Sequence, residues 1–414
     1  MKKLVLLFLL FAFACSKTTT PTSSTPATTN NPPCKPTIIF PLNNSEGQAV
    51  SFPILTWKSS DPDVGDTVCY NVFIDVYNPP TIQYGGTFYD TTLMISDLFA
   101  YTTTYYWKVV AKDNHGLTTS GDVWSFTTRA SPWIEKANII TNRGWLASAL
   151  YDNKIYSIGG ESSDYYNVVE CFDISSNTWS TRSSMPTARS GLIAEAVNNR
   201  IYAIGGASDP NGYLKIVEEY NPTTDTWSSK TSMPTGRQRA ASVVLNGLIY
   251  VLGGLNMGMS SGWVLSIVEA YDPVSNTWTS KASMPIARSQ FTAQVVNGKI
   301  YVMGGESPIV CEYNPTTDSW AYKSDMPFYR ENLTSAKYDN KIYVVGGYSS
   351  TYPYSKLLQV YDPTTDTWSL KSYMLTDRWG CNAITVLNNI YVIGGVNTWN
   401  WLGPTDQYNP SIDI

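Results

Sequence analysis

The residues best suited to chemistry are six arginines that recur at a fixed distance from a tryptophan. Each arginine lies ten residues after its tryptophan, as Arg143 does after Trp133. A guanidinium group offers a fork of N–H donors that suits a carboxylate or a sulfate, so the arginines are candidate ligand-binding residues. The same donors also suit carbonyl groups and carboxylates of neighbouring repeats, and this structural role stays open. The arginines are Arg143, Arg189, Arg237, Arg288, Arg330 and Arg378, and the carboxylates include Glu170, Glu218 and Glu269.

Aromatic residues form a second candidate set. They lie in connecting segments of differing length that follow Gly-Gly pairs, and variable aromatic loops on a rigid scaffold are typical of binding surfaces. Their rings could stack on sugars or on the side chains of a partner, and packing within the loops is the alternative. They are Tyr165, Tyr166, Tyr213, Trp263, Tyr352, Tyr354, Trp399 and Trp401.

The near absence of histidine excludes several kinds of active site. The single histidine, His115, lies in an Asp-Asn-His-Gly turn ahead of the region that holds the six arginines. Copper sites, three-histidine zinc sites and histidine-based triads therefore cannot form in that region. We expect no metal and no cofactor. Glu161 and Glu306 join the three glutamates above as groups that could move a proton, but no spacing singles out a catalytic residue.

The acidic motif Asp61-Pro-Asp-Val-Gly-Asp66 places oxygens together as a calcium loop would. It lacks the twelve-residue spacing with a closing glutamate that such loops use. Aspartates beside proline and glycine commonly accept hydrogen bonds from their own backbone. We therefore predict a turn, with calcium binding as the alternative.

A repeat must position the arginines. Gly-Gly pairs begin at residues 159, 205, 253, 304, 346 and 394, with a tyrosine three residues before each, and this period predicts a solenoid or a propeller. The sixth unit has no tryptophan after it, whereas Trp133 stands alone ahead of the first. We therefore predict six blades with the last one split. Its outer strand would come from residues 133–136 and its inner strands from the C-terminal segment, which protects the sheet edges.

The repeat resembles the kelch repeat, in which a strand ends in Gly-Gly and is followed by tyrosine, tryptophan and Met-Pro-x-x-Arg. The departures are small: Leu375 replaces a proline, Phe172 a tyrosine and Ile139 a methionine. The resemblance implies a six-bladed kelch β-propeller over residues 130–414. Propellers of this kind bind proteins or sugars and occasionally catalyse, so the fold leaves the function open.

Strand parity predicts which face of such a ring binds. Antiparallel pairing places short turns on one face and the segments bearing the arginines and aromatic residues on the other. The short turns suit two-residue hairpins with positive φ, which offer little to hold a ligand. They are Asp152-Asn153, Asn198-Asn199, Asn246-Gly247, Asn297-Gly298, Asp339-Asn340 and Asn388-Asn389.

The N-terminal residues predict export. A charged start and an apolar run have the form of a signal peptide over residues 1–14, and Ala-Phe-Ala-Cys15 resembles a bacterial lipobox. The resemblance implies that Cys15 is lipidated and that the Thr/Ser/Pro-rich residues 15–34 form a tether, with an ordinary signal peptide as the alternative. Residues 35–129 alternate apolar and polar residues and resemble a fibronectin type III-like sandwich. Cys34 and Cys69 could pair at its edge, although we expect most cysteines to be free.

The sequence thus predicts an all-β chain, an Ig/fibronectin-like β-sandwich followed by the propeller, held to the outer membrane or cell surface of a bacterial envelope by its lipid anchor alone. We expect a non-catalytic recognition lipoprotein whose loop face binds a glycan or an extracytoplasmic protein. A net charge of -5 argues against nucleic acid as a partner. The alternative is a sugar-converting kelch enzyme similar to sialate mutarotases. Copper oxidases of the galactose oxidase type pair similar domains but need the missing histidines.

Overall fold

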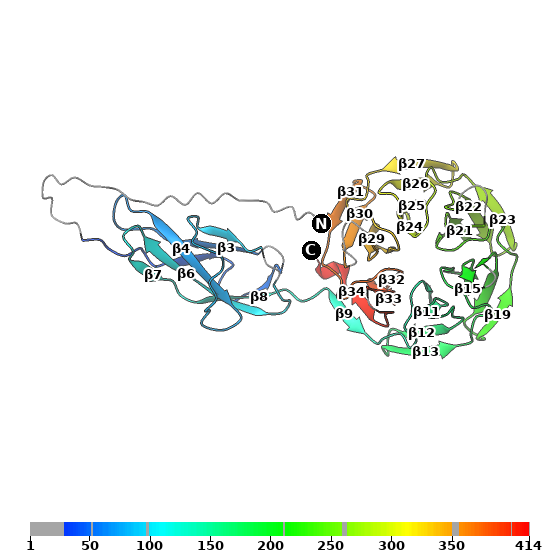
Figure 1. Ribbon diagram of the computed structural model, residues 1–414, viewed down its shortest axis with the longest axis horizontal. Helices are drawn as coiled ribbons and strands as arrows, with labels where there is room; N and C mark the ends of the chain where they lie inside the picture. Colours follow the sequence, from blue (N-terminus) through cyan, green and yellow to red (C-terminus); the bar gives the residue numbers. More distant parts are fainter. Residues whose placement is uncertain are drawn as a thin grey trace. The chain divides into compact units, whose positions relative to one another are not determined.

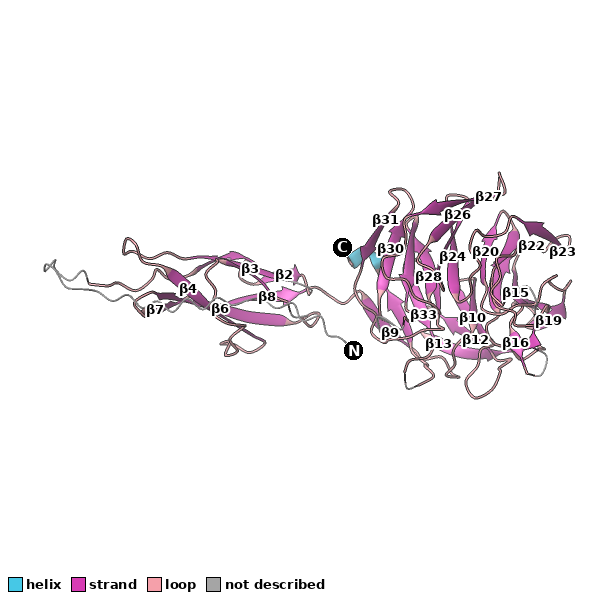
Figure 2. Cartoon of the chain, turned by 45° about the horizontal axis from the view of Figure 1, so that its top comes forward, coloured by secondary structure: helices cyan, strands magenta, loops and turns pink. Residues whose placement is uncertain are grey.

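The structure is a computed structural model, and it describes residues 29–50, 53–96, 99–209, 212–258, 263–349, 356–398 and 400–413. Strands dominate these residues, and their only helix is the short 3-10 turn η1 (Pro410–Ile412) (Figure 2). None of the described helices has the length and hydropathy needed to cross a membrane. The predicted signal peptide and Cys15 lie outside the described residues. The chain divides into two compact units, with the boundary between Ser131 and Pro132.

The first unit packs one three-stranded sheet against one five-stranded sheet. The core between them contains Trp57 from the smaller sheet and Trp107, Val109 and Ala111 from the larger one, all fully buried, as the alternation of that strand predicts. The smaller sheet has the order β1 (Thr37–Phe40), β3 (Ile54–Lys58), β5 (Thr92–Met94). The larger has the order β2 (Ser45–Gln48), β8 (Trp124–Thr128), β6 (Thr104–Asp113), β4 (Val68–Asp75), with β7 (Thr118–Ser120) beside β6.

The acidic motif of this unit forms the predicted turn, in which the Asp63 N–H donates to Asp61 Oδ1 at 2.9 Å. Oxygens of Asp61, Asp63 and Asp66 lie within 4.8 Å of one another. Asp63 also accepts the Asn31 backbone N–H at 2.6 Å, and these bonds from Asn31 lower the pKa of the Asp63 carboxyl. Cys34 and Cys69 are both free, so the structure contains no disulfide between them.

The second unit contains six four-stranded antiparallel sheets, which we call blades 1 to 6 in chain order. They stand side by side around a centre, with the first strand of each blade innermost and the fourth at the rim (Figure 1). The first strands are β10 (Ala147–Tyr151), β14 (Ile193–Val197), β20 (Ala241–Leu245), β24 (Phe291–Val296), β28 (Thr334–Tyr338) and β32 (Asn382–Val386). The second strands are β11 (Lys154–Ile158), β15 (Arg200–Ile204), β21 (Leu248–Leu252), β25 (Lys299–Gly304), β29 (Lys341–Val345) and β33 (Asn389–Ile393).

The outer half of each blade consists of a third and a fourth strand. The third strands are β12 (Val169–Asp173), β18 (Val217–Asn221), β22 (Val268–Asp272), β26 (Val310–Asn314), β30 (Leu358–Asp362) and β34 (Thr405–Tyr408). The fourth strands are β13 (Thr178–Arg182), β19 (Thr226–Ser229), β23 (Thr277–Lys281), β27 (Ser319–Lys323), β31 (Thr367–Leu370) and β9 (Trp133–Lys136). A small hairpin, β16 (Ala207–Ser208) with β17 (Gly212–Tyr213), extends from blade 2.

Blade 6 joins the two ends of the second unit. Its fourth strand, β9, pairs with β34 so that Trp133 lies opposite Tyr408. The two rings are 4.7 Å apart, and the Trp133 indole N–H donates to the carbonyl of Ser372 in the segment that leaves blade 5. The chain therefore closes the ring by strand pairing, which leaves the last sheet without an unpaired edge at that position.

Aromatic rings fill the wedges between blades. The second-strand tyrosine of each blade packs against a third-strand ring of the following blade, as Tyr156 does against Tyr220 at 5.9 Å. That ring in turn packs on the fourth-strand tryptophan, as Tyr220 does on Trp227 at 5.0 Å. The tryptophans and tyrosines of the repeat therefore form the scaffold.

The Gly-Gly pairs allow backbone segments to approach closely. Gly159 has a φ of 61°, and a Cβ atom added there would lie 2.6 Å from the carbonyl oxygen of Arg189 in blade 2. The short turns also have the predicted positive φ, as at Asp152 (49°) and Asn153 (55°). One prediction is wrong by a residue: the last turn uses Leu387 (47°) and Asn388 (65°), and Asn389 already begins β33.

Candidate functional site

The six repeated arginines are buried, with no side chain more than 2% exposed. In five of the six blades the guanidinium donates to the first glycine carbonyl of the Gly-Gly pair in its own blade, as Arg143 Nε does to Gly159 at 2.7 Å. Four arginines also form ion pairs with carboxylates of third strands, at 2.5 to 3.0 Å: Arg143 with Glu170, Arg189 with Glu218, Arg237 with Glu269 and Arg378 with Asp406.

Two blades lack that carboxylate. Arg288 donates to the carbonyls of Gly304 and Ile309, and Arg330 donates to the side chain of Gln359. Burial lowers the pKa of Arg330 to about 9. In the described structure none of the six guanidinium groups reaches a surface. The prediction that they bind a ligand is therefore corrected: they are clamps within the blades, the structural alternative.

A closed ring of backbone hydrogen bonds lies two residues beyond these arginines. The residue at this position in each blade donates its N–H to the carbonyl of its counterpart in the preceding blade, at 2.8 to 3.0 Å. The six residues all have positive φ, between 47° and 59°. Glycine adopts this conformation readily, whereas for tryptophan and arginine it is strained, and such strain is concentrated at functional sites. The residues are Trp145, Gly191, Arg239, Gln290, Asn332 and Gly380.

The two large side chains of this ring lie over its two glycines. A Cβ atom on Gly380 would meet the Trp145 indole at 3.2 Å, and one on Gly191 would meet the Arg239 side chain at 3.3 Å. The Arg239 guanidinium lies 5.2 Å from the centre of the Trp145 ring, which is a cation–π distance. Trp145 Nε1 also donates to Asn332 Oδ1 at 3.2 Å. These side chains cover the mouth of the central channel on the loop face, the face that carries the arginine segments and the loops after the Gly-Gly pairs.

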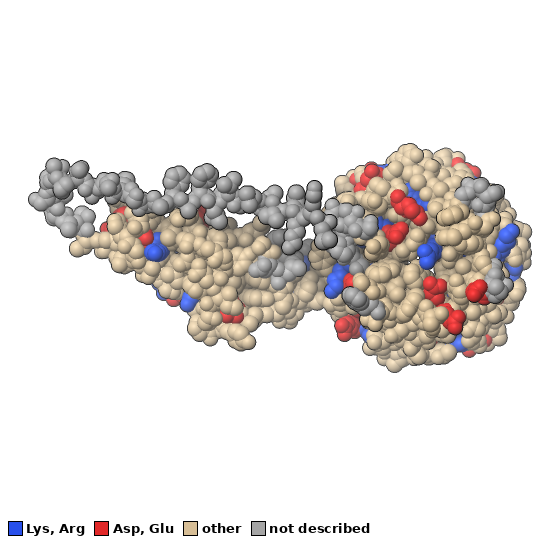
Figure 3. All heavy atoms as spheres, in the orientation of Figure 1, with Lys and Arg blue, Asp and Glu red and all other residues tan. Residues whose placement is uncertain are grey.

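Acidic side chains surround this mouth. Glu161 accepts from Ser190 Oγ at 2.5 Å, and Glu306 accepts from both the Ser289 N–H at 2.9 Å and its hydroxyl at 2.6 Å. Burial raises the pKa of Glu331, and Glu306 acts in the same direction while Arg239 opposes it. Figure 3 shows groups of acidic side chains around the centre of the ring with basic side chains beside them. Within the described residues Arg239 forms no ion pair shorter than 4.0 Å, and its Nη1 donates to Gln290 Oε1 at 3.4 Å.

The structure brings part of the predicted aromatic set to this mouth. Trp401 packs edge-on against Trp145 at 5.5 Å, and Tyr165 pairs with the backbone of Glu161. Burial raises the pKa of Tyr165, with Glu161 next in effect and Arg239 opposing it, so Tyr165 also lies near the cation.

The remaining predicted aromatic residues have varied positions. The Tyr166 hydroxyl lies 2.6 Å from that of Ser162, and Tyr213 belongs to β17. Trp263 is 60% exposed on the loop of blade 3. Nothing is described for Tyr352, Tyr354 and Trp399, which lie outside the described residues.

Sequence reasoning missed Trp145, Arg239 and Glu331. The first two stand two residues after a repeated arginine, and Glu331 stands one residue after. The residue types at these positions vary among the repeats, so an interpretation based on what the repeats share passes over them. Their variation within a fixed frame was the available signal, because the repeat brings them to one mouth.

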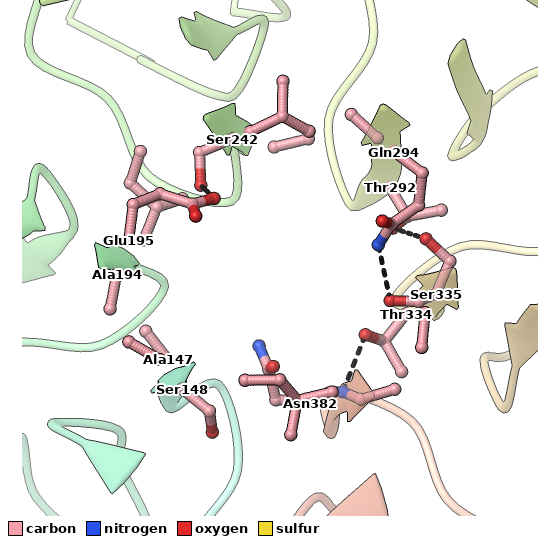
Figure 4. A pocket seen from close by; sticks show the side chains of 18 of the residues that line it. Ala147, Ser148, Ala194, Glu195, Ser242, Thr292, Gln294, Thr334, Ser335 and Asn382 are labelled. Atoms are coloured by element: carbon pink, nitrogen blue, oxygen red, sulfur yellow. Dashed lines mark hydrogen bonds between the residues drawn. The ribbon is translucent and has the colours of Figure 1, made fainter. Parts of the chain in front are cut away.

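Below the mouth, the first strands of all six blades enclose a channel of about 490 Å³. Its polar side chains include Ser148, Glu195, Ser242, Gln294 and Asn382, and Figure 4 shows them around the open centre. The Ser242 hydroxyl donates to Glu195 Oε1 at 2.7 Å, and Gln294 Nε2 donates to the carbonyl of Ser335 at 2.8 Å. The remaining walls are largely alanine and valine.

Comparison with protein families agrees with this geometry. A family described as "KLHDC2/KLHL20/DRC7 Kelch-repeats domain" matches residues 110–305, and the family described as "Kelch motif" matches residues 287–327 and 330–375. The chain contains kelch repeats. A solved structure titled "Structure of YjhT" is similar to this kelch chain, with a TM-score of 0.57 and 14% identity over 67% of this chain and 97% of that one. Such a likeness shows the fold alone, a kelch-type propeller. No significant match to the kelch chain was found among curated proteins.

Proposed function

We propose that this chain is a recognition protein of the bacterial cell envelope that binds a glycan at the mouth of its propeller. In this proposal the propeller is six-bladed with a split last blade, the first unit is a fibronectin type III-like spacer, and a lipid on Cys15 anchors the chain. The six four-stranded sheets, the pairing of β9 with β34 and the two packed sheets of the first unit support this architecture.

The observation that carries the proposal is the strained cluster at the channel mouth. Trp145 offers an aromatic surface held in place by Arg239, Trp401 and Asn332, so binding would freeze little further freedom. Rigid aromatic anchors with a few convergent polar groups are typical of ligand sites.

The chemistry of the cluster favours a sugar. A pyranose ring presents apolar C–H faces that suit an indole and hydroxyl groups that suit carboxylates, amides and guanidinium groups. The mouth supplies these polar groups as Glu161, Glu306, Glu331 and Arg239. A protein partner would instead be expected to use a wider apolar area with few acidic groups at its centre.

A glycan array with the purified protein tests this proposal. We expect saturable binding that falls by about tenfold to thirtyfold in Trp145→Ala, in line with the loss of an aromatic anchor. Tyr322→Ala is the matched control, because Tyr322 is a 63% exposed aromatic residue on β27 at the rim. Equal binding by wild type and Trp145→Ala, or binding to envelope proteins with no glycan hit, would contradict the proposal.

A second candidate function is a sugar-converting activity at the same mouth. It is favoured by Glu331, whose raised pKa beside the Glu306 carboxylate suits a group that exchanges a proton. Interconversion of anomers of the bound sugar can be followed by NMR. Acceleration over buffer that is lost in Glu331→Gln would support catalysis, and a rate equal to that of buffer would leave binding as the function.

The anchor has its own test. Metabolic labelling with a radioactive fatty acid is expected to mark the wild-type chain and to be lost in Cys15→Ser. Labelling that persists in this variant would contradict lipidation at Cys15, and the glycan proposal would be unaffected.

A further inference from the structure

Glu195 is the carboxylate inside the central channel. It lies on β14 of blade 2, and its side chain points along the channel wall toward Ser242 of blade 3 (Figure 4). The Ser242 hydroxyl donates to Glu195 Oε1 at 2.7 Å, and this is the one hydrogen bond that the described residues give the carboxylate. Its second oxygen is therefore left for another donor.

The channel supplies no counter-charge at this carboxylate. Two other charged residues line the channel: Lys337 on β28 and Arg239 at the mouth. Neither lies within 4.0 Å of Glu195 in the described structure, and Arg239 instead stacks on Trp145. Elsewhere in these blades the arginine clamps give buried carboxylates a cation at 2.5 to 3.0 Å. Glu195 is half-buried, and a carboxylate that is partly removed from water without such a partner is stabilised either by a proton or by a cation.

Neutral polar groups lie on other parts of the channel wall. Gln294 on β24 faces Glu195 from across the open centre, and its amide N–H donates to the carbonyl of Ser335 (Figure 4). Ser148 on β10 and Asn382 on β32 add a hydroxyl and an amide to the wall. A group with several N–H donors could therefore use the carboxylate first and neutral acceptors second.

We propose that the central channel binds a small molecule through a primary ammonium group held by Glu195. A primary ammonium group has three N–H donors, which suit the Glu195 carboxylate and the neighbouring Ser242 hydroxyl. The channel volume of about 490 Å³ exceeds what a bare ion needs and has room for an organic body against the alanine and valine walls. A calcium ion fits this wall poorly, because calcium takes six to eight oxygen ligands and the channel offers one carboxylate.

A proton competes with the ammonium group for the Glu195 carboxylate. Burial raises the pKa of Glu195 to about 7, and the Ser242 hydrogen bond opposes the shift. Ammonium binding stabilises the ionised form, so it lowers the midpoint of the Glu195 titration. Lys337 and Arg239 are the other charged groups that line the channel.

Carbon-13 NMR of the glutamate side-chain carboxyl groups in the full-length protein tests this inference. The probe is 1,4-diaminobutane as its dihydrochloride, and potassium chloride at the same ionic strength is the comparison. We expect the diamine to lower the Glu195 midpoint by about one pH unit or more, a tenfold change in proton affinity, and potassium to leave it in place. An unmoved midpoint, or an equal shift with potassium, would overturn the proposal.

Variants add a second reading. Calorimetric titration with the diamine at pH 8 is expected to show at least about tenfold weaker binding by Glu195→Gln than by wild type. Glu135→Gln, which removes an exposed carboxylate from β9 at the rim, is the matched control and should bind as wild type does. Equal affinity of Glu195→Gln and wild type would also overturn the proposal. The wild-type titration needs no variant, and neither reading depends on glycan binding at the mouth.

Discussion

Removing the Glu170 carboxylate tests whether the arginines are internal clamps. In blade 1 this carboxylate accepts from Arg143 Nη1 at 2.6 Å and from the N–H and hydroxyl of Thr141 at 3.0 and 2.8 Å. In Glu170→Ala the guanidinium keeps its bonds to three carbonyl groups and loses its counter-charge. An uncompensated buried charge of this kind destabilises a protein by about 3–5 kcal/mol.

The chain itself supplies the milder variant. In blade 5 the same position holds Gln359, which accepts from Arg330. Glu170→Gln therefore copies an arrangement that the fold already tolerates, with an amide oxygen still facing Arg143. It replaces a charged acceptor with a neutral one while Arg143 keeps its charge, and it should cost about 1–2 kcal/mol in the free energy of unfolding.

Urea unfolding, followed by tryptophan fluorescence, measures both variants. The expected order of stability is wild type, then Glu170→Gln, then Glu170→Ala. Glu135→Ala serves as the control, because its carboxylate is exposed and its loss should change stability by less than about 0.5 kcal/mol. A loss below about 1 kcal/mol for Glu170→Ala, or equal losses for the two Glu170 variants, would refute the clamp and reopen ligand binding by Arg143.

Three further predictions concern stability, each measured by urea unfolding. Gly159→Ala should lower the free energy of unfolding by about 3 kcal/mol or more, because φ is 61° and the new Cβ would lie 2.6 Å from a carbonyl oxygen. Gly247→Ala is the control: its φ is 78° but its Cβ would meet no atom, so it should cost only about 1 kcal/mol. Trp133→Ala should cost about 3–5 kcal/mol, because this ring is 3% exposed and packs on Tyr408, and a smaller loss would contradict its role in closing blade 6. Glu195→Gln should be more stable than wild type by about 1–3 kcal/mol at pH 8 and equal to it near pH 4. The reason is that a carboxyl pKa raised to about 7 disfavours folding only once the group ionises. Equal differences in stability at both pH values would contradict this prediction.

Much of the scaffold could be predicted from the repeat. The spacing of Gly-Gly, tyrosine and tryptophan indicated a ring of sheets, and the lone Trp133 indicated which strand joins the C-terminal segment. These residues pack against copies of one another, so their positions in the sequence reflect their contacts directly. The turn at Leu387 and Asn388 was misplaced by one residue, because turn propensity favours the Asn-Asn pair whereas the pairing of Val386 with Asn389 sets the register.

The site could be predicted only in part. Trp401 and Tyr165 were predicted and lie at the channel mouth, whereas the repeated arginines were assigned a binding role that their burial contradicts. Sequence spacing places an arginine at the start of each blade but does not give the direction of its side chain. That direction depends on the third-strand acceptors, such as Glu170 and Gln359, which lie 27 to 29 residues further along the chain.

The sequence by itself determined the class of fold, the order of strands and the face on which the loops gather, because these follow from periodicity and strand parity. Only the tertiary structure decided which side chains reach the centre. Trp145, Arg239 and Glu195 belong to different blades, and the spacing of the repeat does not show which of their side chains face the channel. They line one channel because the ring of blades closes and brings six inner strands around a common centre.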